Sequence, residues 1–202
     1  MMTITYPVKN GIYVNMTNRW PCSCTFCLRN NADSVYGSDP LWLDREPTVK
    51  EVCDDIDKWD LTKYSEIVFC VYGEPTMRLD DLLEVAKHIK EKSDIKIRIN
   101  TNGLSDLIHN EKTAHKLEGL IDTVSISLNA TNAADYQKTV RSCFGEKSFD
   151  AMLSFTKDCV KYVPSVVMTV VDTVTSKAEQ EKSREICESL GATLRIRPLE
   201  KY

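Results

Sequence analysis

Residues 66–100 read EIVFCVYGEPTMRLDDLLEVAKHIKEKSDIKIRIN, and this stretch decides the fold. The apolar run Glu66–Val71 predicts a strand, and the amphipathic stretch Leu79–Lys92 has the period of a helix. A second apolar run, Ile95–Asn100, follows at once and predicts another strand. Two strands joined by a helix within about 30 residues form a parallel βαβ unit.

The same alternation runs along the whole chain. The predicted strands are Gly11–Asn18, Glu66–Val71, Ile95–Asn100, Thr123–Asn129, Ser165–Val171 and Thr193–Pro198. The predicted helices are Val49–Trp59, Leu79–Lys92, Ser105–Leu117, Ala133–Ser142 with Phe149–Tyr162, and Lys177–Leu190. Capping boxes are expected where Thr48 precedes Glu51 and where Ser176 precedes Glu179, and Gly191 is expected to close the last helix.

These elements predict an α/β fold, a partial (βα)6 TIM-like barrel with a parallel sheet. A complete eight-unit barrel needs about 250 residues, whereas this chain has 202. An open doubly wound sheet is the competing architecture. We expect residues 1–202 to form a single domain, with ligands at the C-terminal ends of the strands.

Composition narrows the class of protein. The net charge is −4, with 42% hydrophobic and 28% charged residues, so no basic field favours nucleic-acid binding. Because no apolar stretch approaches the roughly 20 residues of a membrane span, and no secretory pattern follows Met1, we expect a cytoplasmic protein. Thiols stay reduced in that compartment, so clustered cysteines there usually bind metal or do chemistry.

Three of the eight cysteines crowd into one loop. Residues 18–27 read NRWPCSCTFC and follow the first predicted strand, which brings Cys22, Cys24 and Cys27 together. Soft thiolates in such a loop suit an iron–sulfur cluster or zinc. Structural zinc usually takes four protein ligands, and no second Cys/His pair lies nearby, so we favour a cluster with one iron free of protein ligands. His88, His109 and His115 fall in or near predicted helices and are not expected to bind metal.

Polar residues follow several other predicted strands. Gly73 and Glu74 form a turn after the second strand, Thr101 ends the third, and Ser127 and Asn129 end the fourth. Each pattern alone is compatible with an ordinary turn or a half-buried strand. Their shared position at C-terminal strand ends makes them candidate ligand-binding residues.

The remaining candidates are weaker. Arg195 and Arg197 on the last strand could meet an anion or line a solvated edge. Cys70 and Cys143 could face the site, but reactivity needs an exposed, electropositive setting. The helical cysteines are expected to pack in the core: Cys53, Cys159 and Cys187.

These motifs resemble those of the radical SAM superfamily, which carries Cys-x-x-x-Cys-x-x-Cys after its first strand, with an aromatic residue such as Phe26 before the last cysteine. Aligning Cys24 and Cys27 with the last two family cysteines puts Trp20 at the first. Two interpretations follow: Cys22 supplies the third ligand, or only two thiolates remain and the cluster is bound weakly or not at all.

The turn at Tyr72-Gly73-Glu74-Pro75 resembles the family's Gly-Gly-Glu-Pro motif, which meets the ammonium group of S-adenosylmethionine (SAM). The resemblance implies a four-iron four-sulfur cluster on Cys22, Cys24 and Cys27. It also implies a SAM site that contains Gly73, Glu74, Thr101, Ser127 and Asn129. Reductive cleavage of SAM would give a 5′-deoxyadenosyl radical that abstracts hydrogen from a substrate.

More narrowly, the segments around the cysteines and the Gly-Glu-Pro turn, Ser-Leu-Asn-Ala with Tyr136 and Arg141, and the terminal Arg-Ile-Arg-Pro look like the TatD-associated radical SAM family. The implied partners are a small-molecule or peptide substrate, an electron donor such as a flavodoxin or ferredoxin, and a TatD-type nuclease by functional association. The resemblance names neither the substrate nor a catalytic residue. The alternatives are a peptide- or glycyl-radical-activating enzyme, and a non-enzymatic zinc or iron–sulfur module, which Trp20 and Tyr72 favour.

Overall fold

The computed structural model describes residues 2–27, 33–34, 37–70, 72–172 and 174–198. They form a seven-stranded sheet in which the strands follow one another in sequence order. The first pair is antiparallel and every later pair is parallel. The strands are β1 (Thr5–Val8), β2 (Gly11–Val14), β3 (Glu66–Phe69), β4 (Lys96–Thr101), β5 (Thr123–Ser127), β6 (Ser165–Val171) and β7 (Thr193–Arg197).

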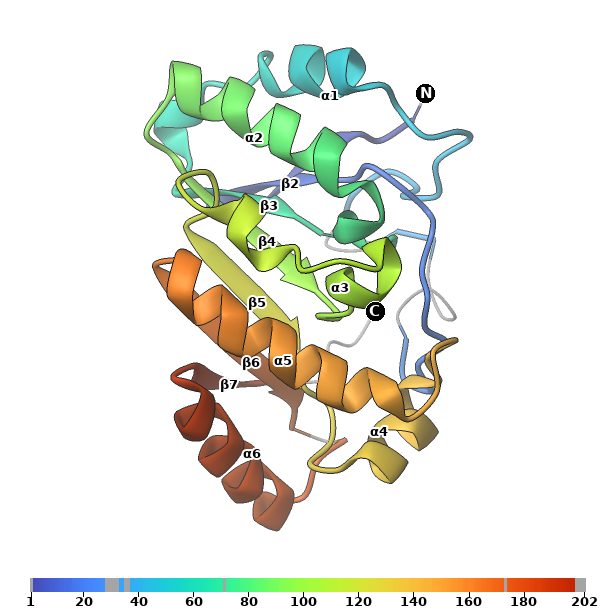
Figure 1. Ribbon diagram of the computed structural model, residues 1–202. Helices are drawn as coiled ribbons and strands as arrows, with labels where there is room; N and C mark the ends of the chain where they lie inside the picture. Colours follow the sequence, from blue (N-terminus) through green and yellow to red (C-terminus); the bar gives the residue numbers. More distant parts are fainter. Residues whose placement is uncertain (1, 28–32, 35–36, 71, 173, 199–202) are drawn as a thin grey trace.

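The helices gather on one face of this sheet (Figure 1). They are α1 (Val49–Ile56), α2 (Leu79–Lys92), α3 (Ser105–His109), α4 (Ala133–Val140), α5 (Lys147–Tyr162) and α6 (Lys177–Leu190), with 3₁₀ turns η2 (Leu61–Lys63), η3 (Pro75–Arg78) and η4 (Ala114–Leu117). A doubly wound sheet reverses its strand order and carries helices on both faces. Sequential order with one helical layer is the partial barrel predicted from the sequence.

Two elements differ from the prediction. Strand β1 was not predicted, because four residues that include Pro7 give too short an alternation; a turn with Lys9 at φ +53° folds it back onto β2. The helix predicted over Ser105–Leu117 is wrong as one element. Asn110 ends α3 in a left-handed conformation, and Asp106 accepts hydrogen bonds from Thr113 that hold the chain in a turn.

Other elements differ only at their ends. The predicted strand Gly11–Asn18 stops at Val14, where the chain leaves the sheet for the cysteine loop. Likewise, the helix predicted to reach Ser142 stops at Val140, because Arg141 is left-handed with φ +50°. Both capping boxes form as expected, and Gly191 closes α6 at φ +78°.

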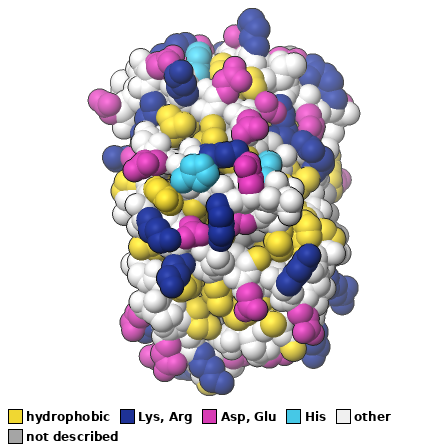
Figure 2. Space-filling view, viewed as in Figure 1, with side chains coloured by type: hydrophobic (Ala, Val, Ile, Leu, Met, Phe, Trp, Pro, Cys, Tyr) yellow, Lys and Arg dark blue, Asp and Glu magenta, His cyan; other side chains and the backbone are white. Residues whose placement is uncertain are grey.

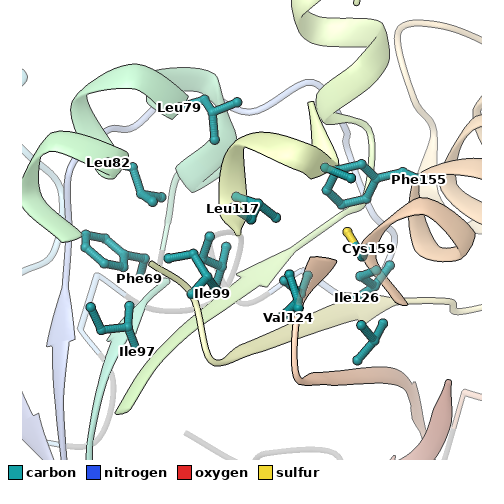
Figure 3. Close-up of a cluster of buried hydrophobic side chains, with 14 of the residues drawn as sticks. Phe69, Leu79, Leu82, Ile97, Ile99, Leu117, Val124, Ile126, Phe155 and Cys159 are labelled. Atoms are coloured by element: carbon teal, nitrogen blue, oxygen red, sulfur yellow. The ribbon is translucent and has the colours of Figure 1, made fainter. Parts of the chain in front are cut away.

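The main core lies between the sheet and the helices. Strand side chains such as Phe69, Ile97 and Ile126 meet Leu82 of α2 and Phe155 of α5 (Figure 3). Full burial of such a side chain stabilises the fold by about 1.5–3 kcal/mol. Three cysteines expected to pack in helices are buried: Cys53, Cys159 and Cys187.

A smaller apolar cluster lies on the opposite face of the sheet, at the β1–β2 end. It contains Tyr6, Val8, Leu41 and Tyr72, with half-buried Tyr13 against it. Trp42 packs edge-on against Tyr72 with ring centroids 5.0 Å apart. Tyr72, which stands at the first glycine of the Gly-Gly-Glu-Pro motif, therefore packs into this smaller apolar cluster.

The helical side of the molecule is charged and mixed in sign. Figure 2 shows acidic and basic side chains interspersed over this face, without a field of one sign. Among the described residues, no helix is long and apolar enough to cross a bilayer.

Candidate functional site

The loops that leave the C-terminal ends of the strands meet around the cysteines. The cysteine loop follows β2 and is held at its stem by a buried arginine. Arg78 donates through Nη1 to the carbonyls of Met16, at 2.8 Å, and Pro47, at 2.7 Å. Arg19 pairs with Glu46 through two hydrogen bonds of 2.7 and 3.1 Å, and Thr17 donates to the same carboxylate. The stem of the loop therefore has a fixed position at the end of the sheet.

The far side of the cysteine loop docks on the end of α4. The last carbonyls of a helix lack partners within it. Here the amide of Ser23 donates to Val140 at 3.0 Å and that of Thr25 to Thr139 at 3.0 Å. Beyond the helix, the amide of Cys143 donates to the carbonyl of Pro21 at 2.9 Å. These bonds bring an additional cysteine next to Cys22, which the sequence alone did not establish.

The three loop thiols lie in a partly buried setting. Cys24 is buried, whereas Cys22 and Cys27 are half-buried. Burial, and the neighbouring Cys27, raise the pKa of the Cys24 thiol to about 12. Burial, Cys24 and Glu74 also raise the pKa of Cys22. Without a bound cation these two thiols stay protonated at neutral pH, whereas a coordinated metal holds a thiol deprotonated.

The thiols do not converge on one point here. Within the part of the chain that the structure describes, no three His, Cys, Asp or Glu side chains are arranged to hold a metal ion. The donor chemistry of three thiols in one loop nevertheless suits an iron–sulfur cluster. His88 and His109 are engaged locally, with Asp57 at 3.0 Å and the Thr76 carbonyl at 2.7 Å.

A buried tyrosine of α4 faces this loop. Tyr136 is fully buried, and its hydroxyl has no hydrogen-bond partner among the described residues. Burial raises its pKa, and the nearby Cys22, Cys24 and Glu74 raise it further. An unsatisfied buried hydroxyl costs about 1–3 kcal/mol, so it marks a place where a polar group would be favourable. The sequence does not predict this unpartnered hydroxyl, because an aromatic residue at helical spacing indicates only packing in the core.

The Gly-Glu-Pro turn packs against the cysteine loop. A Cβ on Gly73 would lie 1.9 Å from the carbonyl oxygen of Thr17, and the amide of Glu74 donates to Arg19 at 2.9 Å. Gly73 is therefore required by the approach of the two loops. This requirement is internal to the protein, and contact of Gly73 with a ligand stays a prediction.

The Glu74 carboxylate is completely buried. Its Oε1 accepts from the amide and hydroxyl of Thr76, at 3.1 and 2.8 Å, and from the hydroxyl of Thr101 at 2.7 Å. Oε2 accepts from the amide of Asn102 at 2.8 Å, which leaves one lone pair on that oxygen. Thr101 in turn accepts from the amide of Gly103, so its hydroxyl is satisfied within the protein. Glu74 and Thr101 thus shape the site, and one lone pair on Oε2 of Glu74 is left for a ligand.

Ser127 and Asn129 differ from this pair. The Ser127 hydroxyl is half-buried and the Asn129 amide is largely buried, and neither side chain makes a hydrogen bond to the described residues. Asn129 adopts a left-handed conformation, φ +59°, directly after β5. These two groups are available to a ligand.

The position of the family's first cysteine holds an indole. Trp20 is half-buried, and its Nε1 is buried without a hydrogen-bond partner in the described chain. Two residues further on, the sulfur of Cys22 accepts from the side-chain Nδ2 of Asn102 at 3.8 Å. The structure thus brings Cys22, Glu74 and Thr101 to one region through Asn102.

Comparisons with known proteins agree with this architecture. Residues 14–183 match the radical SAM superfamily. Over 130 residues the chain is 33% identical to a Methanocaldococcus jannaschii protein with the provisional name glycyl-radical enzyme activating enzyme, covering 63% of this chain. The matched part is 47% of that protein, so the chain spans about half the length of this curated relative.

Two solved structures share the fold. The FeFe-hydrogenase maturase HydG from Carboxydothermus hydrogenoformans superposes with a TM-score of 0.67 at 15% identity, covering 95% of this chain and 44% of HydG. A radical SAM methyltransferase from Sphaerobacter thermophilus gives a TM-score of 0.61 at 19% identity, covering 96% of this chain and 57% of that one. With the family match spanning most of its length, this chain belongs to the radical SAM superfamily.

Proposed function

We propose that this protein binds a four-iron four-sulfur cluster through Cys22, Cys24 and Cys27 and cleaves SAM reductively. The observation that carries the proposal is the position of three thiols in a single loop after β2, braced by Arg78 and docked on α4. When bound, the reduced cluster supplies the electron that splits SAM into methionine and a 5′-deoxyadenosyl radical. The protein contributes ligation, orientation and exclusion of water.

We assign the SAM site to Gly73, Glu74, Thr101, Ser127 and Asn129. Ser127 and Asn129 are proposed as direct contacts, because their polar groups have no partner in the described chain. Glu74 keeps one lone pair that an ammonium group can use, while its other bonds fix the turn. Gly73 and Thr101 act by positioning that carboxylate.

The substrate is proposed to be a protein or peptide, with a flavodoxin or ferredoxin as electron donor. The name of the M. jannaschii relative supports this class, since an activating enzyme acts on another protein. We also propose membership of the TatD-associated radical SAM family, with a TatD-type nuclease as a functional partner. The cysteine-loop and Arg-Ile-Arg-Pro segments support that narrower assignment. Cluster chemistry of this kind suits the reducing cytoplasm.

The test is anaerobic reconstitution with iron and sulfide, then reduction in the presence of SAM and an assay for 5′-deoxyadenosine. The wild type is expected to form it, and Cys24→Ala is expected to lose both the bound iron and the product. Cys187→Ala is the matched control, because Cys187 is a buried cysteine of α6. Equal product from wild type and Cys24→Ala would refute the ligand assignment.

The same preparation tests the non-enzymatic alternative, which Trp20 and Tyr72 favour as departures from the family motifs. A zinc module would contain one zinc per chain as isolated and take up no iron. Such a result would exclude reductive SAM cleavage by this chain.

A further inference from the structure

The side of the sheet that faces away from the helices, here called the inner face, carries an unusual number of polar groups. Strand side chains alternate between the two faces of a sheet. Because Ile97, Val124, Met168 and Leu194 pack toward the helices, their sequence neighbours point to the inner face. On β3 to β7, and directly after β3 in the case of Cys70, those neighbours include Glu66, Cys70, Arg98, Asn100, Ser125, Ser127, Thr169, Arg195 and Arg197.

On the β3–β4 half of the inner face, the polar side chains form hydrogen bonds with one another. Arg98 donates to both oxygens of Glu66, at 2.9 and 2.7 Å, and to Asn100 at 2.7 Å. The side-chain Nδ2 of Asn100 donates to the sulfur of Cys70 at 3.2 Å. The charged and polar side chains of this half are therefore paired with one another.

On the β5–β7 half, the polar side chains lack such partners among the described residues. Ser127, Thr169 and Arg195 lie side by side across three neighbouring strands, because Ser127 pairs with Thr169 and Thr169 pairs with Arg195. Arg197 follows two residues later on the same face. None of these four side chains makes a hydrogen bond or ion pair with the described residues, and the Nε of Arg197 is buried without a partner.

The buried Nε of Arg197 is costly without an acceptor, because its removal from water is not compensated by a hydrogen bond. Arginine presents donors in a planar fork that matches the two oxygens of a carboxylate or phosphate. Residues two apart on a strand lie about 7 Å apart on the same face. Arg195 and Arg197 can therefore converge on one oxyanion, with the Thr169 hydroxyl as a third donor.

We propose that Arg195, Arg197 and Thr169 bind an oxyanion of the substrate, a carboxylate or a phosphate, at the C-terminal ends of β6 and β7. This rests on the proposed function, in which Ser127 and Asn129 on β5 contact SAM. The substrate anion then lies on the side of SAM remote from the cysteine loop, which follows β2. The proposed protein or peptide substrate is accordingly one that carries a carboxylate or a phosphate at this position.

The first measurement is calorimetric titration of the cluster-free full-length chain with inorganic phosphate and, separately, with succinate. Wild type is expected to bind at least one of the two, and the preferred ion distinguishes phosphate from carboxylate recognition. Arg197→Ala should weaken that binding about ten-fold or more, as expected for loss of a charge-assisted pair. Arg197→Lys should recover only part of it, because lysine lacks the fork.

Arg184→Ala is the matched control, since Arg184 is an exposed arginine that pairs with Glu181 on α6. It should bind the ions like wild type. Arg195→Ala, at an exposed position on the same strand, provides a second variant if Arg197→Ala fails to fold. No binding by wild type, or equal binding by both site variants and wild type, would overturn the proposal.

A second measurement separates substrate from cofactor. The affinity of the reconstituted protein for SAM, measured by equilibrium dialysis, is expected to be the same in Arg197→Ala as in wild type. A loss of SAM affinity equal to the loss of phosphate or succinate affinity would assign the anion to the SAM carboxylate and reject a substrate site. Because the ion titrations use cluster-free protein, they remain decisive even if no 5′-deoxyadenosine forms.

Discussion

Gly73 and Thr17 approach so closely that a Cβ atom on Gly73 would lie 1.9 Å from the Thr17 carbonyl oxygen and 2.7 Å from its methyl carbon. The loop after β3 is thus pressed against the stem of the cysteine loop. A hydrogen bond of 2.9 Å from the Glu74 amide to Arg19 joins them one residue further on. The two loops that carry the proposed ligands of the cluster and of SAM behave as one structural unit.

This contact predicts that Gly73→Ala is strongly destabilising. A methyl group here meets backbone atoms, which cannot swing aside, so the free energy of unfolding should fall by about 3 kcal/mol. Urea denaturation followed by circular dichroism measures it. Gly119→Ala is the control: it is strained by φ +74° but meets no atom within 4 Å, and should cost about 1 kcal/mol. Equal losses in the two variants would contradict the close-approach argument.

The same residues show what the sequence could and could not predict. Periodicity located the strands and helices because each buries one regular face, and this fixed the barrel-like architecture. Contact of Glu74 with a ligand stays a prediction, and the structure adds hydrogen bonds from Thr101 and Asn102, 27 and 28 residues further along the chain, to its carboxylate. Contacts between distant loops leave no local pattern, which is why the role of Gly73 and the orphaned hydroxyl of Tyr136 were not predictable.

Because the hydroxyl of Tyr136 has no partner in the described chain, we expect its removal to stabilise the protein. Tyr136→Phe removes a buried donor that has no partner in the described chain, so the cluster-free protein should become more stable by about 1 kcal/mol. Thermal or urea unfolding tests this, with Tyr162→Phe, at a half-buried tyrosine of α5, as a neutral control. A loss of stability in Tyr136→Phe would show that the hydroxyl is satisfied.

Asp122 predicts a pH dependence away from the site. Partial burial raises the pKa of its carboxyl, but hydrogen bonds from Lys90, the Ile97 amide and Lys96 outweigh this and hold the pKa below its ordinary value. A lowered pKa in the folded state adds stability above the unfolded pKa of about 3.8, and this contribution is lost as the pH falls. Asp122→Asn should therefore cost about 2 kcal/mol at pH 7.

The matching measurement is the free energy of unfolding from pH 7 down to pH 3. The difference between wild type and Asp122→Asn should be constant above about pH 5 and should shrink below about pH 4. Asp94→Asn, at an exposed position in the same region, is the matched control variant. A difference that grows on acidification would reverse the sign of the assigned shift.

The last prediction concerns the displaced cysteine. If Cys22 replaces the ligand that the family carries at the position of Trp20, Cys22→Ala should lose most of the iron of a reconstituted cluster. Adding Trp20→Cys to that variant should restore it to about four irons per chain, because the family spacing is then re-created with Cys24 and Cys27. Iron and sulfide analysis, with electron paramagnetic resonance of the reduced protein, measures both steps.

Cys143→Ala is the control for this pair, since its amide bond to Pro21 places Cys143 beside the loop without making it one of the assigned ligands. It should retain full iron. Loss of iron in Cys143→Ala together with retention in Cys22→Ala would transfer the third ligand to the loop after α4. The Cys22→Ala, Trp20→Cys double variant distinguishes Cys22 from Cys143 as the third ligand. A thiol at residue 20 lies on the same loop as residue 22, so it can replace a ligand lost at Cys22 but not one lost at Cys143.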